Sequence, residues 1–439
     1  MNDKPEDLLH DLITAARRAG ADAAEARANH SASTSIEVRL GKLETVQRQE
    51  PENWSLRVWV GARSASLGSI DLSARAMRDT LVERALTMAR LAPEDPYSGL
   101  APVEIIRSVS SADEAVLQLY DPVEPTAAAL EDAARAAEAA ALAAAGVTNS
   151  SGARATANTT RNWHVTSEGL AIERHRSSFG LQVGVVAGKD GTMETDSYGR
   201  NAVWQADLPP AASIGAEAAR RAVARLGPRR LSSTRAPVIF ERRVATALIS
   251  PLLGAIHGQN IARGTSFLRR RLGEAVFGRE VALLADPLVV RGMGSHLVDS
   301  EGLPSKARAL IDDGVLTGWI LDVASARQLG MAPNSGSPGN LTLAPGADSM
   351  TDLMAQAGTG LLVTSMFGPS LNAATGDWSA GVSGIWFEHG VAAYPVNEIT
   401  VAGSLSDFYA RLIPASDLVI ESGFDAPSLL VDAVTIAGA

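Results

Sequence analysis

The chain has 439 residues, of which 46% are hydrophobic and 20% are charged, so it is long enough to form two or three domains with sizeable cores. Its net charge of −10 disfavours attraction of a phosphate backbone, and nucleic acid is therefore not an expected partner. The absence of cysteine excludes disulfide frameworks, cysteine zinc sites and thiol nucleophiles.

The N-terminus lacks the basic segment and apolar core of a signal peptide. Acidic and basic side chains interrupt the most apolar helical stretch, residues 126–145, and no run of eighteen apolar residues occurs. A chain without cysteine also fits a reducing compartment. We therefore expect a cytoplasmic protein with no membrane span.

Hydrophobic periodicity predicts an α+β pattern at the start of the chain. The first 95 residues show helical spacing, then several alternating segments, then a second helix. The predicted helices are residues 6–19 and 71–92, and the predicted strands are residues 35–40, 43–48, 54–60 and 66–70. Residues 93–125 are rich in proline and aspartate and are predicted to form an irregular excursion.

Helix propensity predicts that the alanine-rich residues 126–145 form a helix. Residues 153–203 then read as strands, with a hairpin turn at Asp190-Gly191. A further helix is predicted over residues 211–226, followed by a linker rich in proline and arginine. We place a domain boundary in this linker, which gives an N-terminal α+β domain over residues 1–230 and a C-terminal domain over residues 231–439.

The C-terminal domain opens with a strand and a helix, residues 237–240 and 244–257, and is β-rich afterwards. Pro251 indicates either a kink in this helix or a new helix capped by Ser250. Hairpins are predicted at Asp313-Gly314 and His389-Gly390. Strands at residues 396–401 and 428–436 flank a short helix at 405–413. Because no helix follows each strand, an antiparallel or mixed sheet or barrel is expected.

Residues with catalytic potential are few. None of the seven histidines is paired at the i,i+4 spacing of a zinc helix, no His-Glu dipeptide or serine elbow occurs, and no catalytic or metal-binding residue is assigned. His257 lies on a helix predicted to be buried and is interpreted as a structural histidine. Carboxylates cluster at Asp299, Glu301, Asp312 and Asp313 and could do acid–base work, but the turn at Asp313-Gly314 favours a local structural role.

Four C-terminal segments carry a family resemblance: residues 299–330, 338–346, 372–390 and 395–403. They include the runs Asp-Ser-Glu-Gly-Leu-Pro-Ser-Lys, Pro-Gly-Asn-Leu-Thr-Leu and Pro-Val-Asn-Glu-Ile-Thr-Val-Ala-Gly. Together they resemble the TldD/PmbA family, also called the modulator of DNA gyrase family, and most closely its PmbA (TldE) branch.

The resemblance implies a cytoplasmic TldD–TldE heterodimer that degrades or trims peptides. In that family the TldD-type subunit holds zinc through a His-Glu-x-x-x-His helix and a later cysteine. Alignment places Ile249, Ser250 and Gly254 where the zinc-bearing branch has His, Glu and His, and the cysteine is missing. We therefore expect no cofactor in this chain, with zinc in a TldD-like partner.

Peptides are the expected substrates, and this chain is expected to help form the groove that holds them, with His257 as a candidate groove residue. A homodimer could form when the partner is absent. Two alternatives stay open: a homodimeric peptidase with an unrecognised site, and a scaffold that binds peptides without hydrolysis.

Overall fold

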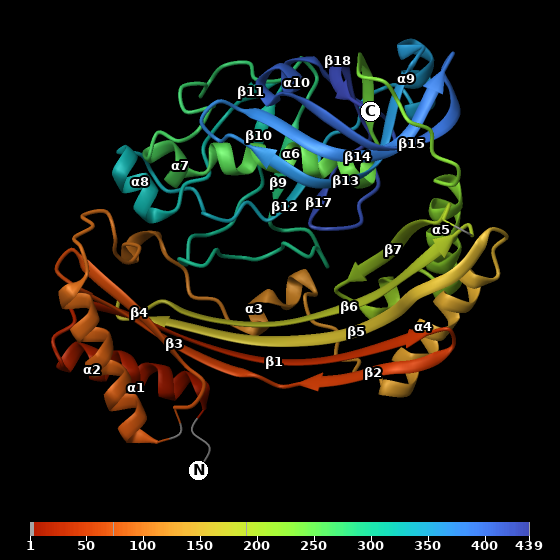
Figure 1. Ribbon diagram of the computed structural model, residues 1–439. Coiled ribbons are helices and arrows are strands. Elements are labelled where there is room, and N and C mark those ends of the chain that lie inside the picture. Colours follow the sequence, from red (N-terminus) through yellow and green to blue (C-terminus); the bar gives the residue numbers. More distant parts are fainter. Residues whose placement is uncertain (1–3, 73, 190, 439) are drawn as a thin grey trace.

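The computed structural model describes residues 4–72, 74–189 and 191–438. Its N-terminal half is built on a curved antiparallel sheet, in which β1 pairs with β2, β3 and β5 (Figure 1). The seven strands run in the order β4-β3-β1-β5-β6-β7, with β2 beside β1. Their bounds are β1 Ala23–Arg39, β2 Lys42–Gln49, β3 Glu52–Val60, β4 Arg63–Ser69, β5 Val147–Thr166, β6 Ala171–Ala187 and β7 Glu194–Ala202.

Two pairs of helices cover the same face of this sheet. The helices α1 (Pro5–Arg18) and α2 (Arg75–Leu91) pack on Ala24, Ala26 and Leu56. At the other end, α4 (Ala127–Leu142) and α5 (Ala211–Ala224) pack on Ile36 and Val38. All four β1 residues have even numbers and therefore point to one face, which leaves the odd-numbered Arg27 and Asn29 on the opposite face. That polar face looks toward the C-terminal half of the chain (Figure 1).

The C-terminal half contains a closed five-stranded barrel. The strands run β15-β14-β13-β8-β18, and pairing of β18 with β15 closes the circle. Only β13 and β8 are parallel within it. The bounds are β8 Thr234–Phe240, β13 Gly360–Leu371, β14 Asp377–Glu388, β15 Val391–Ser404 and β18 Leu429–Ala437, with the short β16 (Leu412–Pro414) beside β18.

A smaller five-stranded sheet completes this half, in the order β11-β10-β9-β12-β17. Its strands are β9 Leu283–Asp286, β10 Arg308–Asp312, β11 Val315–Leu316, β12 Asn340–Leu343 and β17 Phe424–Asp425. The helices here are α6 Arg242–Ile256, α7 Gly258–Ala262, α8 Val323–Leu329, α9 Met350–Ala357 and α10 Leu405–Arg411. The α+β class and the β-rich, mostly antiparallel C-terminal half with a helix near its start are therefore confirmed. The domain division near residue 230 stays a prediction.

Several local predictions need correction. The strand predicted at residues 35–40 is the end of the longer β1, whose first half was missed because alanines there give a weak alternation. The excursion at residues 93–125 holds three short helices, η1 Val103–Ile105, α3 Ser111–Glu114 and η2 Ala115–Leu117. A further short helix, η3 (Gln205–Asp207), precedes α5. The hairpin between β6 and β7 forms, although Asp190 of its predicted turn lies outside the described residues.

The helix α6 runs through Pro251 without a break, so Ser250 does not cap a new helix. The Ser250 hydroxyl instead donates to the carbonyl oxygen of Thr246 at 2.7 Å. The buried Tyr409 hydroxyl donates to the carbonyl oxygen of Leu248 at 3.0 Å. Pro251 has no backbone N–H and therefore weakens this turn of α6. The Tyr409 side chain adds a hydrogen bond to the same turn from outside the helix.

The alanine-rich helix α4 has a packing role that helix propensity alone does not explain. Its buried alanines face α5, where Gly215 and Ala218 lie. A Cβ atom built on Gly215 would lie 2.0 Å from the carbonyl oxygen of Ala137. Small residues therefore allow the two helix backbones to approach closely. No helix in the described part of the chain has the length and apolarity needed to cross a membrane.

Candidate functional site

The three positions aligned with the zinc ligands lie on α6 and do not share one surface. Ile249 is 0% exposed and packs in the core inside the barrel, whereas Ser250 and Gly254 are exposed. Residues four apart lie one above the other on a helix, so Ser250 and Gly254 are neighbours. Ile249 and Gly254 are five apart, which rotates their side chains by about 140°.

These residues do not fit a zinc ion. Isoleucine and glycine side chains have no donor atom, and the Ser250 hydroxyl is engaged with Thr246. Among the residues that the structure describes, no group of three or more His, Cys, Asp or Glu side chains is placed to hold a metal ion. The chemistry that this chain can offer therefore has to come from its other polar side chains.

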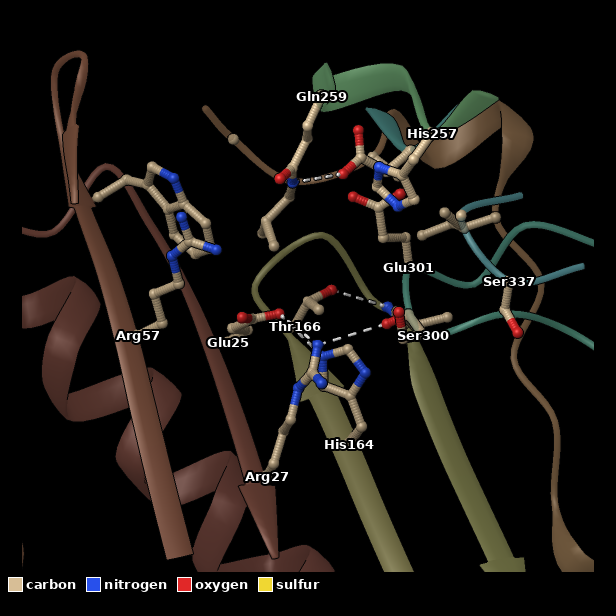
Figure 2. Close-up of a pocket in the computed structure, with 18 residues that line it drawn as sticks. Glu25, Arg27, Arg57, His164, Thr166, His257, Gln259, Ser300, Glu301 and Ser337 are labelled. Carbon is tan, nitrogen blue, oxygen red and sulfur yellow. Dashed lines mark hydrogen bonds and ion pairs between the residues drawn. The ribbon is translucent and has the colours of Figure 1, made fainter. Parts of the chain in front are cut away.

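Several such side chains line a cavity of about 320 Å³ (Figure 2). One wall is the polar face of the N-terminal sheet, which contributes Glu25 and Arg27 from β1, Arg57 from β3 and His164 from β5. The other wall comes from the C-terminal half, and includes the loop around Glu301. His164 and Glu301, which lie on opposite walls, are 137 positions apart in sequence.

The predicted groove residue His257 lies in the lining of this cavity. It stands at the junction of α6 and α7, where its backbone forms an isolated bridge to Ile320. Gln259, two residues later, also reaches the cavity. Ser250 and Gly254 are absent from the lining, so the cavity and the exposed surface of α6 are separate features.

A hydrogen-bonded pair of a histidine and a glutamate lies on the sheet wall. The His164 imidazole Nε2 lies 3.1 Å from Glu25 Oε2. Burial disfavours ionisation of Glu25, but the hydrogen bond with His164 and the charge of Arg27 outweigh it and lower its pKa to about 2. Burial also lowers the pKa of His164, so the imidazole is neutral near pH 7. Because Glu25 is then an anion, Nε2–H donates to it and Nδ1 is left as an acceptor.

Two arginines share this wall. The Arg27 guanidinium lies 3.3 Å from Glu25 and also donates to the carbonyl oxygen of Ser300 across the cavity at 3.4 Å. Arg57 stacks over Trp59 at 4.6 Å and donates to the hydroxyls of Ser64 and Ser98. The cation on each arginine is thus partly satisfied within the sheet wall itself.

Carboxylates dominate the opposite wall. Glu301 Oε2 accepts a hydrogen bond from the backbone N–H of Val323 at 2.8 Å. Asp322 caps α8 through the N–H of Ser325 and accepts from Gln259 Nε2 at 3.2 Å. Burial, together with the nearby charges of Asp299, Asp322 and Glu25, raises the pKa of Glu301 to about 7. This carboxyl group is held in a site that does not favour its charge.

Glu301→Gln is expected to raise the free energy of unfolding by about 1–2 kcal/mol at pH 8, after allowance for partial solvent contact. The pKa of Glu301 rises from 4.5 to about 7 on folding, so its ionisation destabilises the fold above pH 4.5, increasingly up to pH 7. The gain should therefore shrink toward zero near pH 4.5. Urea unfolding at several pH values measures it. Exposed Glu388→Gln serves as the control, and a gain independent of pH would contradict this account.

Sequence reasoning found only part of this site. It singled out Asp299 and Glu301 but grouped them with Asp312 and Asp313, which the structure places at the hairpin of β10 and β11, away from the cavity lining. It missed Glu25, Arg57 and His164, which come from separate strands. The available signal was polar residues at alternate positions in β1 and β5, which marked one face of the sheet as polar.

The fold and the site define a two-part α+β protein in which a curved sheet faces a closed barrel across a charged cavity. Solved structures share this fold. A protein described as a modulator of DNA gyrase from Bacteroides thetaiotaomicron matches with a TM-score of 0.92 and 24% identity, covering 100% of both chains. TldE from Thermococcus kodakarensis matches with a TM-score of 0.83 and 18% identity, covering 98% of this chain and 100% of that one.

The sequence comparison narrows this class to one family. The models described as PmbA/TldA metallopeptidase domain 1, central domain and C-terminal domain match residues 24–89, 120–226 and 233–438. The chain is 34% identical over 425 residues to Metalloprotease PmbA of Escherichia coli O157:H7, covering 95% of this chain and 92% of that relative. The chain belongs to the PmbA/TldD metallopeptidase family, as the C-terminal motifs predicted.

Proposed function

We propose that this chain is the zinc-less, PmbA/TldE-type subunit of a heterodimeric peptidase whose zinc is held by a TldD-like partner. The observation that carries the proposal is the residue set of α6. At the three positions aligned with the zinc ligands, the chain has a buried isoleucine, an engaged serine and a glycine. A helix that has neither the two histidines nor the glutamate at these positions, in a barrel of the family fold, fits a subunit that contributes structure and substrate contacts.

The substrates in this proposal are peptides, in keeping with the metalloprotease name of the 34% identical relative. An extended peptide can be bound by strand addition, because edge strands present unpaired backbone groups. The strands β4 and β7 are edges of the N-terminal sheet. His257 and the charged cavity supply side-chain contacts near the junction of the two halves. The lack of cysteine fits action in the cytoplasm.

Native mass spectrometry of the tagged chain, isolated from its own cells, tests the proposal. The expected species is a heterodimer with one zinc ion per pair. The chain purified alone should carry no stoichiometric zinc and should not cleave peptides, whereas the pair should cleave them and lose this activity on chelation. The physical reason for the difference is that a bound zinc ion lowers the pKa of its water and so activates it at neutral pH.

Two outcomes would contradict the proposal. A zinc-loaded homodimer with chelator-sensitive activity would mean that this chain is a peptidase with its own zinc site. A zinc-free homodimer that binds peptides without any second protein would favour the scaffold function. Ser250→Ala provides a sharper check, because loss of activity in a heterodimer that still assembles would place α6 of this chain in the catalytic site.

A further inference from the structure

The lining of the charged cavity has more carboxylates than guanidinium groups. Its lining holds three carboxylates and two guanidinium groups: Glu25, Glu301 and Asp322 against Arg27 and Arg57. Of these acids only Glu25 has a cationic partner, which is Arg27, and Glu25 also accepts a hydrogen bond from the neutral His164. Glu301 and Asp322 form no ion pair within 4.0 Å in the part of the chain described, and Asp299 lies close enough to add further negative charge.

The hydrogen bonds made by the two unpaired acids leave them able to accept more. Glu301 accepts only the Val323 N–H through Oε2, so Oε1 has no partner in the described chain. Asp322 is held in place by Ser325 and Gln259, both of which orient its carboxylate. Partial burial of a carboxylate without a nearby cation costs free energy. A ligand that brings a positive charge and several N–H donors would lower that cost.

A second, independent feature of the cavity is a histidine nitrogen that can accept a hydrogen bond. His164 is 8% exposed, and its Nε2–H is committed to Glu25. Its Nδ1 nitrogen has no hydrogen-bond partner in the described chain, and the ring lines the cavity (Figure 2). This nitrogen is not one of the fully buried polar atoms without a partner, so a donor in the cavity can reach it. The acids on one wall and this imidazole on the other can therefore accept hydrogen bonds from the same kind of group.

We propose that this cavity binds a primary ammonium group of a peptide, with Glu301 and Asp322 as its carboxylate partners and the Arg57–Trp59 pair beside the adjoining peptide. A cavity of about 320 Å³ is small among ligand sites, so it admits a peptide end or one long side chain and excludes a folded protein. A carboxylate end is disfavoured because it would face the unpaired acids. A metal ion is disfavoured because the described His, Cys, Asp and Glu side chains form no metal-holding group.

The choice of a peptide as the carrier of the ammonium group rests on the proposed function, whereas recognition of the ammonium group rests on the cavity alone. The test therefore uses the full chain without a partner. Isothermal titration compares three probes: the tripeptide amide Ala-Ala-Ala, its N-acetylated form, and N-acetyl-Ala-Lys-Ala amide. Binding of the first probe and not the second identifies the α-amino group, and binding of the third identifies a lysine side chain.

Glu301→Gln combined with Asp322→Asn should weaken binding of the free-amine probe at least tenfold. Asn keeps a capping oxygen at the start of α8, so the fold is retained. Asp312→Asn removes one charge from the exposed end of β10, outside the cavity, and should leave binding unchanged. Equal binding of the acetylated and free peptides, no binding of any ammonium probe, or full binding by the double variant would overturn the proposal. None of these results depends on zinc or on a second subunit, so the two proposals fail separately.

Discussion

Gly215→Ala is expected to lower the free energy of unfolding by about 2–3 kcal/mol. The new methyl group would lie 2.0 Å from the carbonyl oxygen of Ala137 and 3.0 Å from the backbone nitrogen of Ala141. Both contacts are with helix backbone, which cannot rotate away as a side chain can, so α4 and α5 must separate. Overpacking of this kind costs about 1–3 kcal/mol, and lost contacts among the alanines of this cluster add to it.

Gly254→Ala is the matched control, because it makes the same substitution in the last turn of another helix, α6. No atom lies within 4 Å of a Cβ atom built there, and the residue is exposed. Alanine is a better helix former than glycine by about 1 kcal/mol, so this variant should be slightly more stable than the parent chain. Urea unfolding of both variants provides the comparison. If Gly215→Ala were as stable as Gly254→Ala, the close approach of α4 and α5 would be wrong.

This pair of glycines shows what the sequence could and could not predict about the fold. The helices were predicted from periodicity and propensity, which are local properties of the chain. That the alanines of α4 face α5 depends on which helices the sheet brings together, and no local pattern encodes that. Closure of the barrel has the same character, because β18 pairs with β8 and with β15, strands distant from it in sequence. The hairpins at Gly314 and Gly390 were predictable because their turn chemistry is local.

The candidate site was less predictable for the same reason. Glu301 and Asp299 are close together in sequence, which marked them as candidates. Their nearest acidic neighbours in sequence, Asp312 and Asp313, lie at a predicted hairpin turn, and this favoured a structural role for the whole cluster. The cavity exists only where this loop meets the polar face of the sheet. Glu25 and His164, 139 residues apart, become partners because β1 and β5 pair in register. The pKa of a buried carboxyl group rises when no cation lies nearby, and which groups lie nearby is decided by the tertiary structure.

Asp299→Ala is expected to cost about 3 kcal/mol and to disorganise the cavity. Asp299 is 2% exposed and accepts three backbone N–H groups. Oδ1 accepts from Glu301 at 2.8 Å and Leu303 at 2.9 Å, and Oδ2 accepts from Gly336 at 3.2 Å. Alanine would leave these donors without their partner, at about 1–3 kcal/mol for each that water cannot reach. The side chain thus joins the loop that carries Glu301 to the segment at Gly336, and both segments line the cavity.

Asp299→Asn separates the packing of this side chain from its hydrogen bonds. The amide keeps one oxygen, which can continue to accept from Glu301 and Leu303, but its NH₂ group cannot accept from Gly336. We therefore expect about half of the loss seen for alanine, measured by urea unfolding at pH 7. Hydrogen exchange of the Glu301 and Leu303 amides should accelerate strongly in Asp299→Ala and little in Asp299→Asn. Equal stability of all three proteins would show that Asp299 does not organise this loop, and the ammonium site built on Glu301 would then lose its rigid support.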